Sequence, residues 1–220
     1  HRQGGNRKIE DTLNKALMLL DFRNPYSEDF YKSICKTREY LESELYCGDD
    51  PNVPTVACIG HTHIDIAWLW TIRQTREKAE RSFLTVEELV KKYPEYRFMS
   101  SQPQLYSYVK ETNPRLYSEI KRYIKERRWE AEGAMWLEAD TNLTGGESLI
   151  RQIIFGKKFM KEEFGTDNRI LWLPDVFGYS AALPQIMKKC GIDCFFTTKI
   201  YWNETNSMPH DTFMWEGLDG

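Results

Sequence analysis

The stretch Thr55-Val-Ala-Cys-Ile-Gly-His-Thr-His-Ile-Asp65 decides the fold class of this chain. Its first five residues are a short apolar run, which predicts a β-strand over residues 55–59. Side chains that can bind metal ions follow at once, at His61, His63 and Asp65. An apolar strand that ends in such a polar group is typical of a sheet whose edge carries a ligand site.

The same kind of apolar run recurs along the rest of the chain. Further strands are predicted over residues 97–100, 129–136, 169–173 and 194–198. Amphipathic stretches between them predict helices over residues 73–92, 103–125 (interrupted near Pro114), 146–164 and 181–189, the last of them capped by Gly191. Strands that alternate with helices favour parallel pairing with helical crossovers. We therefore predict an α/β fold built on a parallel sheet, similar to part of a βα-barrel.

The first 50 residues have a different pattern. Apolar residues recur every three or four positions between residues 7 and 22, and a second amphipathic segment runs from about Pro25 to Tyr46. The turn-forming sequence Gly48-Asp-Asp-Pro-Asn52 follows. We therefore predict a short helical N-terminal segment over residues 1–50 and an α/β domain over residues 51–220.

The composition excludes several classes of protein. The 220 residues carry 30 Lys and Arg against 33 Asp and Glu, a net charge of −3, whereas nucleic-acid-binding domains are normally basic. No apolar run approaches the ~20 residues that a membrane-spanning helix needs. The five cysteines are scattered and form no CxxC pair, which favours reduced thiols in a cytoplasmic protein. We expect neither a nucleic-acid nor a membrane partner.

In parallel α/β folds the ligand site lies at the carboxyl ends of the strands, so the residues after each predicted strand are the candidate site residues. Residues two apart share one side of an extended chain, which places His61, His63 and Asp65 in one polar row after the first strand. Imidazole and carboxylate are ligands of zinc and similar divalent ions. The alternative interpretation of the spacing is a surface loop with incidental histidines.

The fourth strand leads into Leu173-Pro-Asp-Val-Phe-Gly-Tyr-Ser180, where Asp175 is a single carboxylate behind an apolar run. A charge at such a position is costly to bury without a partner. Asp175 is therefore either a cap or turn residue, or else a third metal ligand, a nucleophile, or both. Two strand ends that each carry metal-type ligands support one another more than either does alone.

Other strand ends and aromatics are weaker candidates. Asp140 follows the third strand in a mixture of acids, an amide and aromatics that is typical of sugar sites, although a turn is the stronger interpretation. Lys199 follows the fifth strand and either faces a pocket or is solvated. Trp68 either offers a flat face to a pyranose ring or packs in the core, and for Trp70 we expect the core.

Four motifs stand in order along the chain: Gly60-His-Thr-His-Ile-Asp-Ile-Ala-Trp68, Glu132-Gly-Ala-Met-Trp-Leu-Glu-Ala-Asp-Thr-Asn142, Gly146-Glu-Ser-Leu-Ile-Arg-Gln152 and Leu173-Pro-Asp-Val-Phe-Gly-Tyr-Ser180. Together with the closing Phe213-Met-Trp-Glu-Gly-Leu-Asp-Gly220, they resemble glycoside hydrolase family 38, the α-mannosidases, and within it the bacterial and cytosolic type. The resemblance covers about residues 55–220. It implies an α/β catalytic domain with a parallel sheet.

The resemblance also implies an activity. Such enzymes hydrolyse terminal α-mannosidic bonds in mannose-containing oligosaccharides by a retaining mechanism, with one divalent ion, Zn²⁺ or another such as Co²⁺, in each catalytic site. By the same resemblance His63, Asp65 and Asp175 match metal ligands, and Asp175 also matches the nucleophile. His61 belongs to the motif but is usually not a ligand.

The resemblance names substrate-binding residues as well. Trp68 matches the aromatic residue under the sugar ring, and Lys199 stands where some members have an arginine near the substrate. We count Asp140 with them as a substrate-binding candidate.

The chain departs from the family in its length. The family's fourth metal ligand, a histidine, and its acid/base carboxylate lie later in the sequence, and nothing matches His210 to that ligand. We therefore expect residues 51–220 to be a catalytic domain truncated on its C-terminal side. We also expect the isolated chain to be inactive and to self-associate through an exposed apolar face.

Two other functions are compatible with the same residues. A metal-dependent amide or phosphoester hydrolase would suit His61-Thr-His63 after a first strand, but such sites generally use several more histidines, and this chain has four in all. A sugar-binding module without catalysis would suit the tryptophans. Convergence of His63, Asp65 and Asp175 would argue against that module, because binding alone requires no nucleophile.

Overall fold

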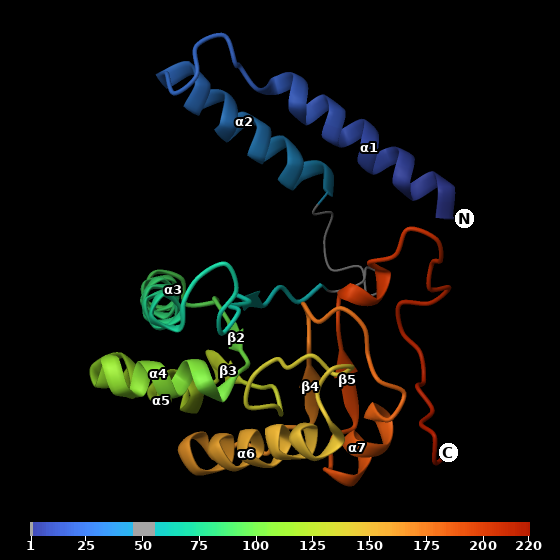
Figure 1. The fold of residues 1–220 in the computed structure, drawn as a ribbon. Helices are drawn as coiled ribbons and strands as arrows, with labels where there is room; N and C mark the ends of the chain where they lie inside the picture. Colours follow the sequence, from blue (N-terminus) through green and yellow to red (C-terminus); the bar gives the residue numbers. More distant parts are fainter. Residues whose placement is uncertain (1, 46–55) are drawn as a thin grey trace. The chain divides into compact units, whose positions relative to one another are not determined.

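The computed structural model describes residues 2–45 and 56–220 of the chain. Two compact units are distinguished, residues 1–57 and residues 58–220, and Figure 1 draws both. The predicted boundary between residues 50 and 51 lies outside the described residues. Within the described part of the chain, no helix is both long and apolar enough to cross a lipid bilayer.

The first unit is a pair of antiparallel helices, α1 (Arg2–Leu19) and α2 (Glu28–Leu45). Both helices were predicted, but their ends differ from the predicted ones by several residues. The chain leaves the helical path after α1 because the carboxylate of Asp21 accepts hydrogen bonds from the backbone N–H and the guanidinium of Arg23, which closes a turn. The hydroxyl of Ser27 then caps α2 by accepting a hydrogen bond from a backbone N–H of its first turn.

The second unit contains five short strands in two sheets. One sheet has the order β1-β2-β3 and the other pairs β4 with β5, and every pairing among the described residues is parallel. Helices cross from strand to strand, so the predicted α/β class is confirmed. The strands are β1 (Gly60–His61), β2 (Phe98–Ser100), β3 (Trp129–Ala131), β4 (Ile170–Trp172) and β5 (Cys194–Phe196).

The prediction of the first strand over residues 55–59 is wrong within the described residues. Residues 56–59 have no strand partner, and the ladder begins at Gly60, which pairs with Phe98. The side chains of Val56 and Ile59 are 80% and 55% exposed, so the apolar run that suggested the strand is not buried here. Where a strand forms depends on its neighbour, and β2 offers ladder partners only from Phe98 onward.

The third strand is also shorter than the predicted residues 129–136. Gly133 has a φ of 126°, a conformation that side-chain-bearing residues rarely adopt, and it turns the chain out of β3. The turn leads directly to the second sheet, because the N–H of Ala134 donates a hydrogen bond to the carbonyl of Ile170 at 3.1 Å. One turn therefore both ends β3 and joins the edges of the two sheets.

The predicted helices of the second unit are confirmed with small changes at their ends. α3 begins with a capping box, in which Thr71 and Gln74 each satisfy a backbone N–H of the other. The predicted interruption falls at Asn113, whose side chain caps α5 ahead of Pro114. The helices are α3 (Ile72–Lys92), α4 (Pro103–Thr112), α5 (Pro114–Lys125), α6 (Gly146–Phe164) and α7 (Leu183–Lys189), with a 3₁₀ turn over Lys199–Tyr201.

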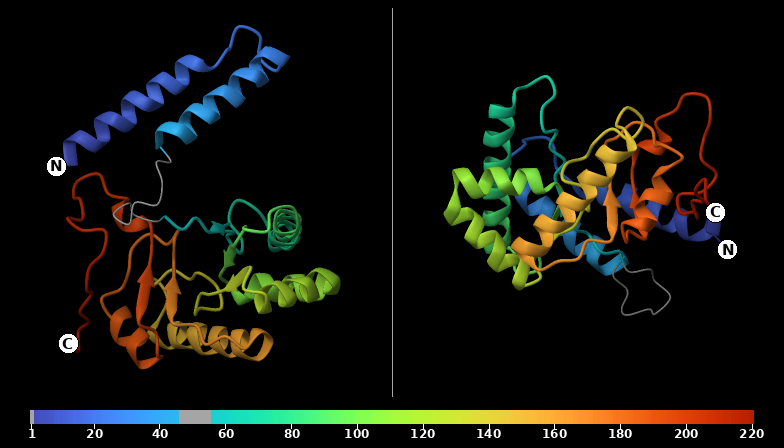
Figure 2. Two further views of the ribbon diagram at one scale, coloured as in Figure 1. Left: turned by 180° about the vertical axis from the view of Figure 1, so that it is seen from behind. Right: turned by 60° about the horizontal axis from the view of Figure 1, so that its bottom comes forward.

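Two apolar clusters hold these elements together. The first gathers α3, α4 and α5 beside the β1–β3 sheet (Figures 1 and 2). It surrounds Trp129, which contacts the rings of Phe83 and Phe98 edge-on. The second packs α6 and α7 against β4 and includes Leu171. α6 approaches the turn after β3 so closely that a Cβ on Gly156 would collide with backbone atoms there. Both clusters thus support the segments that follow the strands.

Candidate metal and catalytic centre

Alternation along the segment after β1 directs its polar side chains to one side. Ile64 is buried in the first apolar cluster, and Ile66 packs against it from a half-buried position. His63 and Asp65 therefore face the other way, toward the loop after β4. Thr75 of α3 holds the backbone of the segment after β1, because its hydroxyl donates a hydrogen bond to the carbonyl of Asp65 at 3.3 Å.

Asp175, on the loop after β4, completes a group with these two residues. The Nε2 atom of His63 lies 3.0 Å from Oδ1 of Asp65 and 3.4 Å from Oδ2 of Asp175. One donor atom from each of the three residues lies within 4.8 Å of the others, and all three side chains are half-buried. Residues 110 positions apart in the sequence are thus brought to one point by the parallel strands that precede them.

These distances fit a single zinc-sized ion. Two ligands at about 2.0–2.1 Å from Zn²⁺ in tetrahedral geometry are separated by about 3.4 Å, which is close to both measured separations. One imidazole and two carboxylates are also the donor types that zinc and cobalt accept. His63, Asp65 and Asp175 are therefore able to hold a divalent ion, with room in its coordination shell for another ligand.

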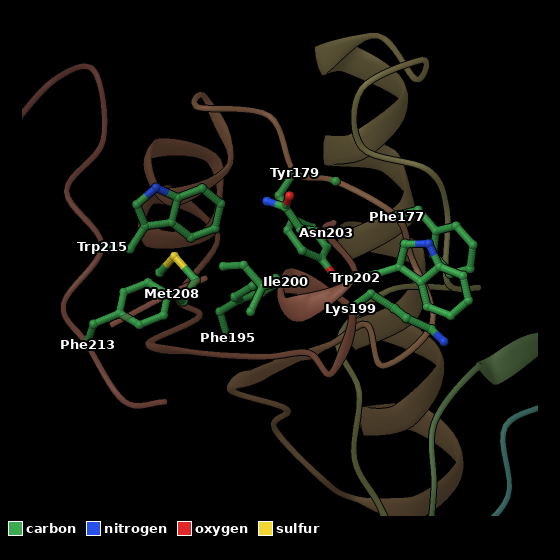
Figure 3. Close-up of a pocket in the computed structure, with 11 residues that line it drawn as sticks. Phe177, Tyr179, Phe195, Lys199, Ile200, Trp202, Asn203, Met208, Phe213 and Trp215 are labelled. Atoms are coloured by element: carbon green, nitrogen blue, oxygen red, sulfur yellow. The ribbon is translucent and has the colours of Figure 1, made fainter. Parts of the chain in front are cut away.

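Lys199, the first residue of the 3₁₀ turn after β5, contacts the other oxygen of the Asp175 carboxylate. Its Nζ lies 2.8 Å from Oδ1 of Asp175. The ammonium also lies 5.1 Å from the ring centre of Phe177 and 4.7 Å from that of Trp202, and these two rings stack within 13° of parallel (Figure 3). Attraction between the ammonium and the two aromatic rings favours one orientation of the Lys199 side chain. The two oxygens of Asp175 thus face different partners.

A cavity of about 650 Å³ has Lys199 in its wall. Its wall is mostly aromatic, and Figure 3 shows these side chains gathered between the loop after β4 and the C-terminal part of the chain. The residues that line it are Phe177, Gly178, Tyr179, Phe195, Lys199, Ile200, Trp202, Asn203, Met208, Phe213 and Trp215.

Glu138, on the segment after β3, is a site residue that the sequence analysis missed. Its Oε2 atom lies 2.8 Å from Nδ1 of His63, and its side chain is only 4% exposed. Its other oxygen accepts a hydrogen bond from the hydroxyl of Ser101 at 2.9 Å. The sequence signal for Glu138 is an acid inside an otherwise apolar stretch after a strand, where a charge needs a partner. The predicted candidate was instead Asp140, two positions later.

The carboxylates around His63 control its charge. Burial by itself would lower the pKa of this imidazole, but the negative charges of Glu138 and Asp65 outweigh burial and raise the pKa of His63 to about 9. These carboxylates therefore favour the protonated, positively charged form of His63 when no metal is bound, and the same negative charge would attract a divalent ion.

The three-residue group does not include the other sequence candidates His61, Asp140 and Trp68. His61 has both ring nitrogens engaged, since Nδ1 lies 3.0 Å from the carbonyl of Met99 and Nε2 accepts from the indole of Trp172 at 3.3 Å. Asp140 is exposed and closes a turn by accepting from two backbone N–H groups at 2.8 Å, which is the turn interpretation of that residue. Trp68 is 67% exposed, so its ring is open to a ligand.

Comparisons with known proteins define the family. Residues 53–220 match the model of the glycosyl hydrolases family 38 N-terminal domain, and the chain belongs to this family. α-Mannosidase G of Dictyostelium discoideum is 40% identical over 91% of the chain, and α-mannosidase 2C1 of Homo sapiens is 47% identical over 76% of it. The chain spans only 18% and 16% of the lengths of these two relatives.

A solved structure supports the fold. The crystal structure of an α-mannosidase from Enterococcus faecalis V583 superposes with a TM-score of 0.58 over 63% of this chain and 16% of that one. The two sequences are 19% identical in this comparison, so the likeness concerns the backbone arrangement alone. The α/β class predicted from strand and helix alternation is the class found in that enzyme.

Proposed function

We propose that this chain carries the nucleophile and three metal ligands of a retaining α-mannosidase that acts on terminal α-mannosidic bonds of mannose-containing oligosaccharides. The observation that carries the proposal is the convergence of His63, Asp65 and Asp175. Lys199 contacts Oδ1 of Asp175, the oxygen that does not face His63. Membership of family 38 supplies the substrate class, because the relatives that match are named α-mannosidases.

In this proposal Asp175 attacks the anomeric carbon of the mannoside. The new bond joins a carboxylate oxygen to that carbon, the bond to the leaving oxygen breaks, and water later hydrolyses the glycosyl ester with overall retention. Lys199 contributes by holding Oδ1 of Asp175 in place at 2.8 Å. A retaining enzyme also needs a carboxyl group that protonates the leaving oxygen, and we assign no residue of this chain to that role.

The divalent ion, Zn²⁺ or Co²⁺, would be held by His63, Asp65 and Asp175. When bound, it would supply positive charge that orients sugar hydroxyls and keeps the carboxylate of Asp175 ionised. For substrate contact we propose Trp68, whose exposed indole suits the apolar face of a pyranose. Asp140 stays a weaker substrate-binding proposal, because its carboxylate is already engaged by backbone N–H groups.

The first test is the metal content of the purified chain after incubation with excess Zn²⁺ and removal of unbound ion. We expect close to one zinc per chain in the wild type, and its loss in His63→Ala and in Asp175→Ala. Asp167→Asn is the matched control, because Asp167 is an exposed carboxylate whose ion-pair partner, Lys157, belongs to no part of the proposed site. Zinc content that is equal in all four proteins, or absent from the wild type, would contradict the proposed site.

The second test addresses the nucleophile. In a chimera, this chain replaces the matching segment of α-mannosidase G, which is 40% identical to it. We expect the chimera to hydrolyse an aryl α-mannoside, and an activated fluorinated mannosyl fluoride to add one sugar mass to the peptide containing Asp175. Turnover that survives Asp175→Asn at the level of the unmodified chimera, or a label on another residue, would refute the assignment.

A further inference from the structure

The mechanism above gives no role to a buried carboxylate that lies against His63, that of Glu138. A carboxyl side chain that is 4% exposed depends on partners within the protein, because the interior solvates polar and charged groups poorly. Glu138 divides its two oxygens between two partners: Oε2 lies 2.8 Å from Nδ1 of His63, and Oε1 accepts from Ser101 at 2.9 Å. The serine partner fixes the rotation of the carboxylate, so the remaining oxygen is aimed at the imidazole.

The backbone around Glu138 is tied to the segment that carries His63. The side chain of Gln102 bridges the two segments, since its Oε1 accepts from the N–H of Glu138 at 3.2 Å and its Nε2 donates to the carbonyl of Ile64 at 3.0 Å. Gln102 is 3% exposed and has a φ of 62°, an uncommon conformation that the surrounding contacts must hold. One amide therefore sets the distance between the carboxylate and the residue it faces.

This arrangement determines which ring nitrogen of His63 is directed at the candidate metal ligands. Oε2 of Glu138 lies 2.8 Å from Nδ1, so this side of the ring faces a carboxylate, and Nε2 is left to face Asp65 at 3.0 Å and Asp175 at 3.4 Å. Metal-binding histidines commonly donate their second ring N–H to a carboxylate, which orients the ring and increases its basicity. The geometry of Glu138 matches that pattern.

We propose that Glu138 is the positioning residue of His63: it fixes the imidazole so that Nε2 points at the ion held by His63, Asp65 and Asp175. Ser101 and Gln102 support it by fixing the carboxylate and its backbone. The inference rests on the proposed function, since it assigns Glu138 to the same metal site. Glu138 itself touches neither the ion nor the substrate.

The test uses the 220-residue chain with Zn²⁺ or Co²⁺ alone as the probe. We expect Glu138→Gln to bind zinc about 10-fold more weakly than the wild type in calorimetry, and Glu138→Ala between about 10-fold and 100-fold more weakly. Ser101→Ala, which removes the donor to Oε1, should give a smaller loss of the same kind. Glu130→Gln is the matched control, because Glu130 lies on β3, the strand that precedes the segment of Glu138, and its side chain is exposed. It should bind zinc as the wild type does.

Two spectroscopic measurements separate positioning from a purely structural role. The Nδ1 proton of His63 should be visible far downfield in the NMR spectrum of the wild type and should move or disappear in Glu138→Gln. The absorption spectrum of bound Co²⁺ should change as well, because the imidazole is no longer held. If Glu138→Gln folds, keeps the zinc affinity of the wild type and leaves the Nδ1 proton where it was, the inference is wrong.

Failure of this inference is distinguishable from failure of the metal site. If the wild type and His63→Ala both fail to bind Zn²⁺, the proposed metal site is wrong, while the His63 Nδ1 resonance without metal still shows whether Glu138 holds the ring. If the wild type binds zinc and His63→Ala does not, but both Glu138 variants bind it normally, the metal site stands and the role of Glu138 falls.

Discussion

Replacing Glu87 with glutamine should reveal how the first apolar cluster holds a buried charge. Glu87 lies on α3 with 2% of its side chain exposed. Its two oxygens accept a two-pronged pair of hydrogen bonds from the guanidinium of Arg115 at 2.8 and 2.9 Å, and Lys91 lies 2.9 Å away. The pair joins α3 to the first turn of α5, so its loss should weaken the packing of the two helices.

The pKa of Glu87 gives the size and the pH dependence of the effect. The hydrogen bonds from Arg115, with those from Lys91, outweigh burial and lower the pKa of Glu87 from 4.5 to about 2. Such a difference corresponds to at most about 3.4 kcal/mol. Both partners are about half exposed, so solvent screening reduces the expected contribution to about 1–2 kcal/mol. Because the pKa is lower in the folded state, this stability is present above pH 4.5 and is lost as the pH falls toward 2.

Urea unfolding of the wild type and of Glu87→Gln, followed by far-UV circular dichroism from pH 7 to pH 2, measures this contribution. We expect the variant to be about 1–2 kcal/mol less stable at pH 7 and the gap to close between pH 4.5 and pH 2. Glu88→Gln is the control, because its side chain is 73% exposed, and it should change stability by less than about 0.5 kcal/mol. A gap that is absent at pH 7, or that does not vary with pH, would refute the reasoning.

Three further predictions concern the site and its support. Zinc at 100 times its dissociation constant should stabilise the wild type by about 2.7 kcal/mol in thermal unfolding, a chelator should reverse this, and His63→Ala should respond to neither. Lys199→Met should bind zinc several-fold more tightly in calorimetry, because a positive charge beside Asp175 is removed. Lys199→Arg keeps the charge and should bind zinc as the wild type does. Equal zinc affinities of the wild type and both variants would contradict this electrostatic argument. Gly156→Ala should lower stability by about 3 kcal/mol in urea, because its Cβ would enter the backbone after β3, while Gly145→Ala, with open space around it, should stay within about 0.5 kcal/mol.

The helices were predictable because their signals are local. The apolar periodicity and the Thr71 cap lie within the segments that become α3, and the same holds for α6 and the Gly165 that ends it. The strands were less predictable, because a strand exists only where a neighbour completes its ladder. The run at residues 55–59 therefore suggested a strand that pairs only from Gly60, and the third strand stopped at Ala131, where the chain turns toward the second sheet.

The sequence by itself determined the α/β class, the positions of the helices and the segments in which candidate site residues lie. Those follow from residue type and short spacing, and His63, Asp65 and Asp175 could be named because each lies just beyond a strand. Only the tertiary structure decided how the segments after different strands meet. It set Glu138 rather than Asp140 against His63, and it directed Lys199 at Asp175. Such contacts join residues tens of positions apart, and their distances depend on sheet register and turn geometry, which no local pattern records.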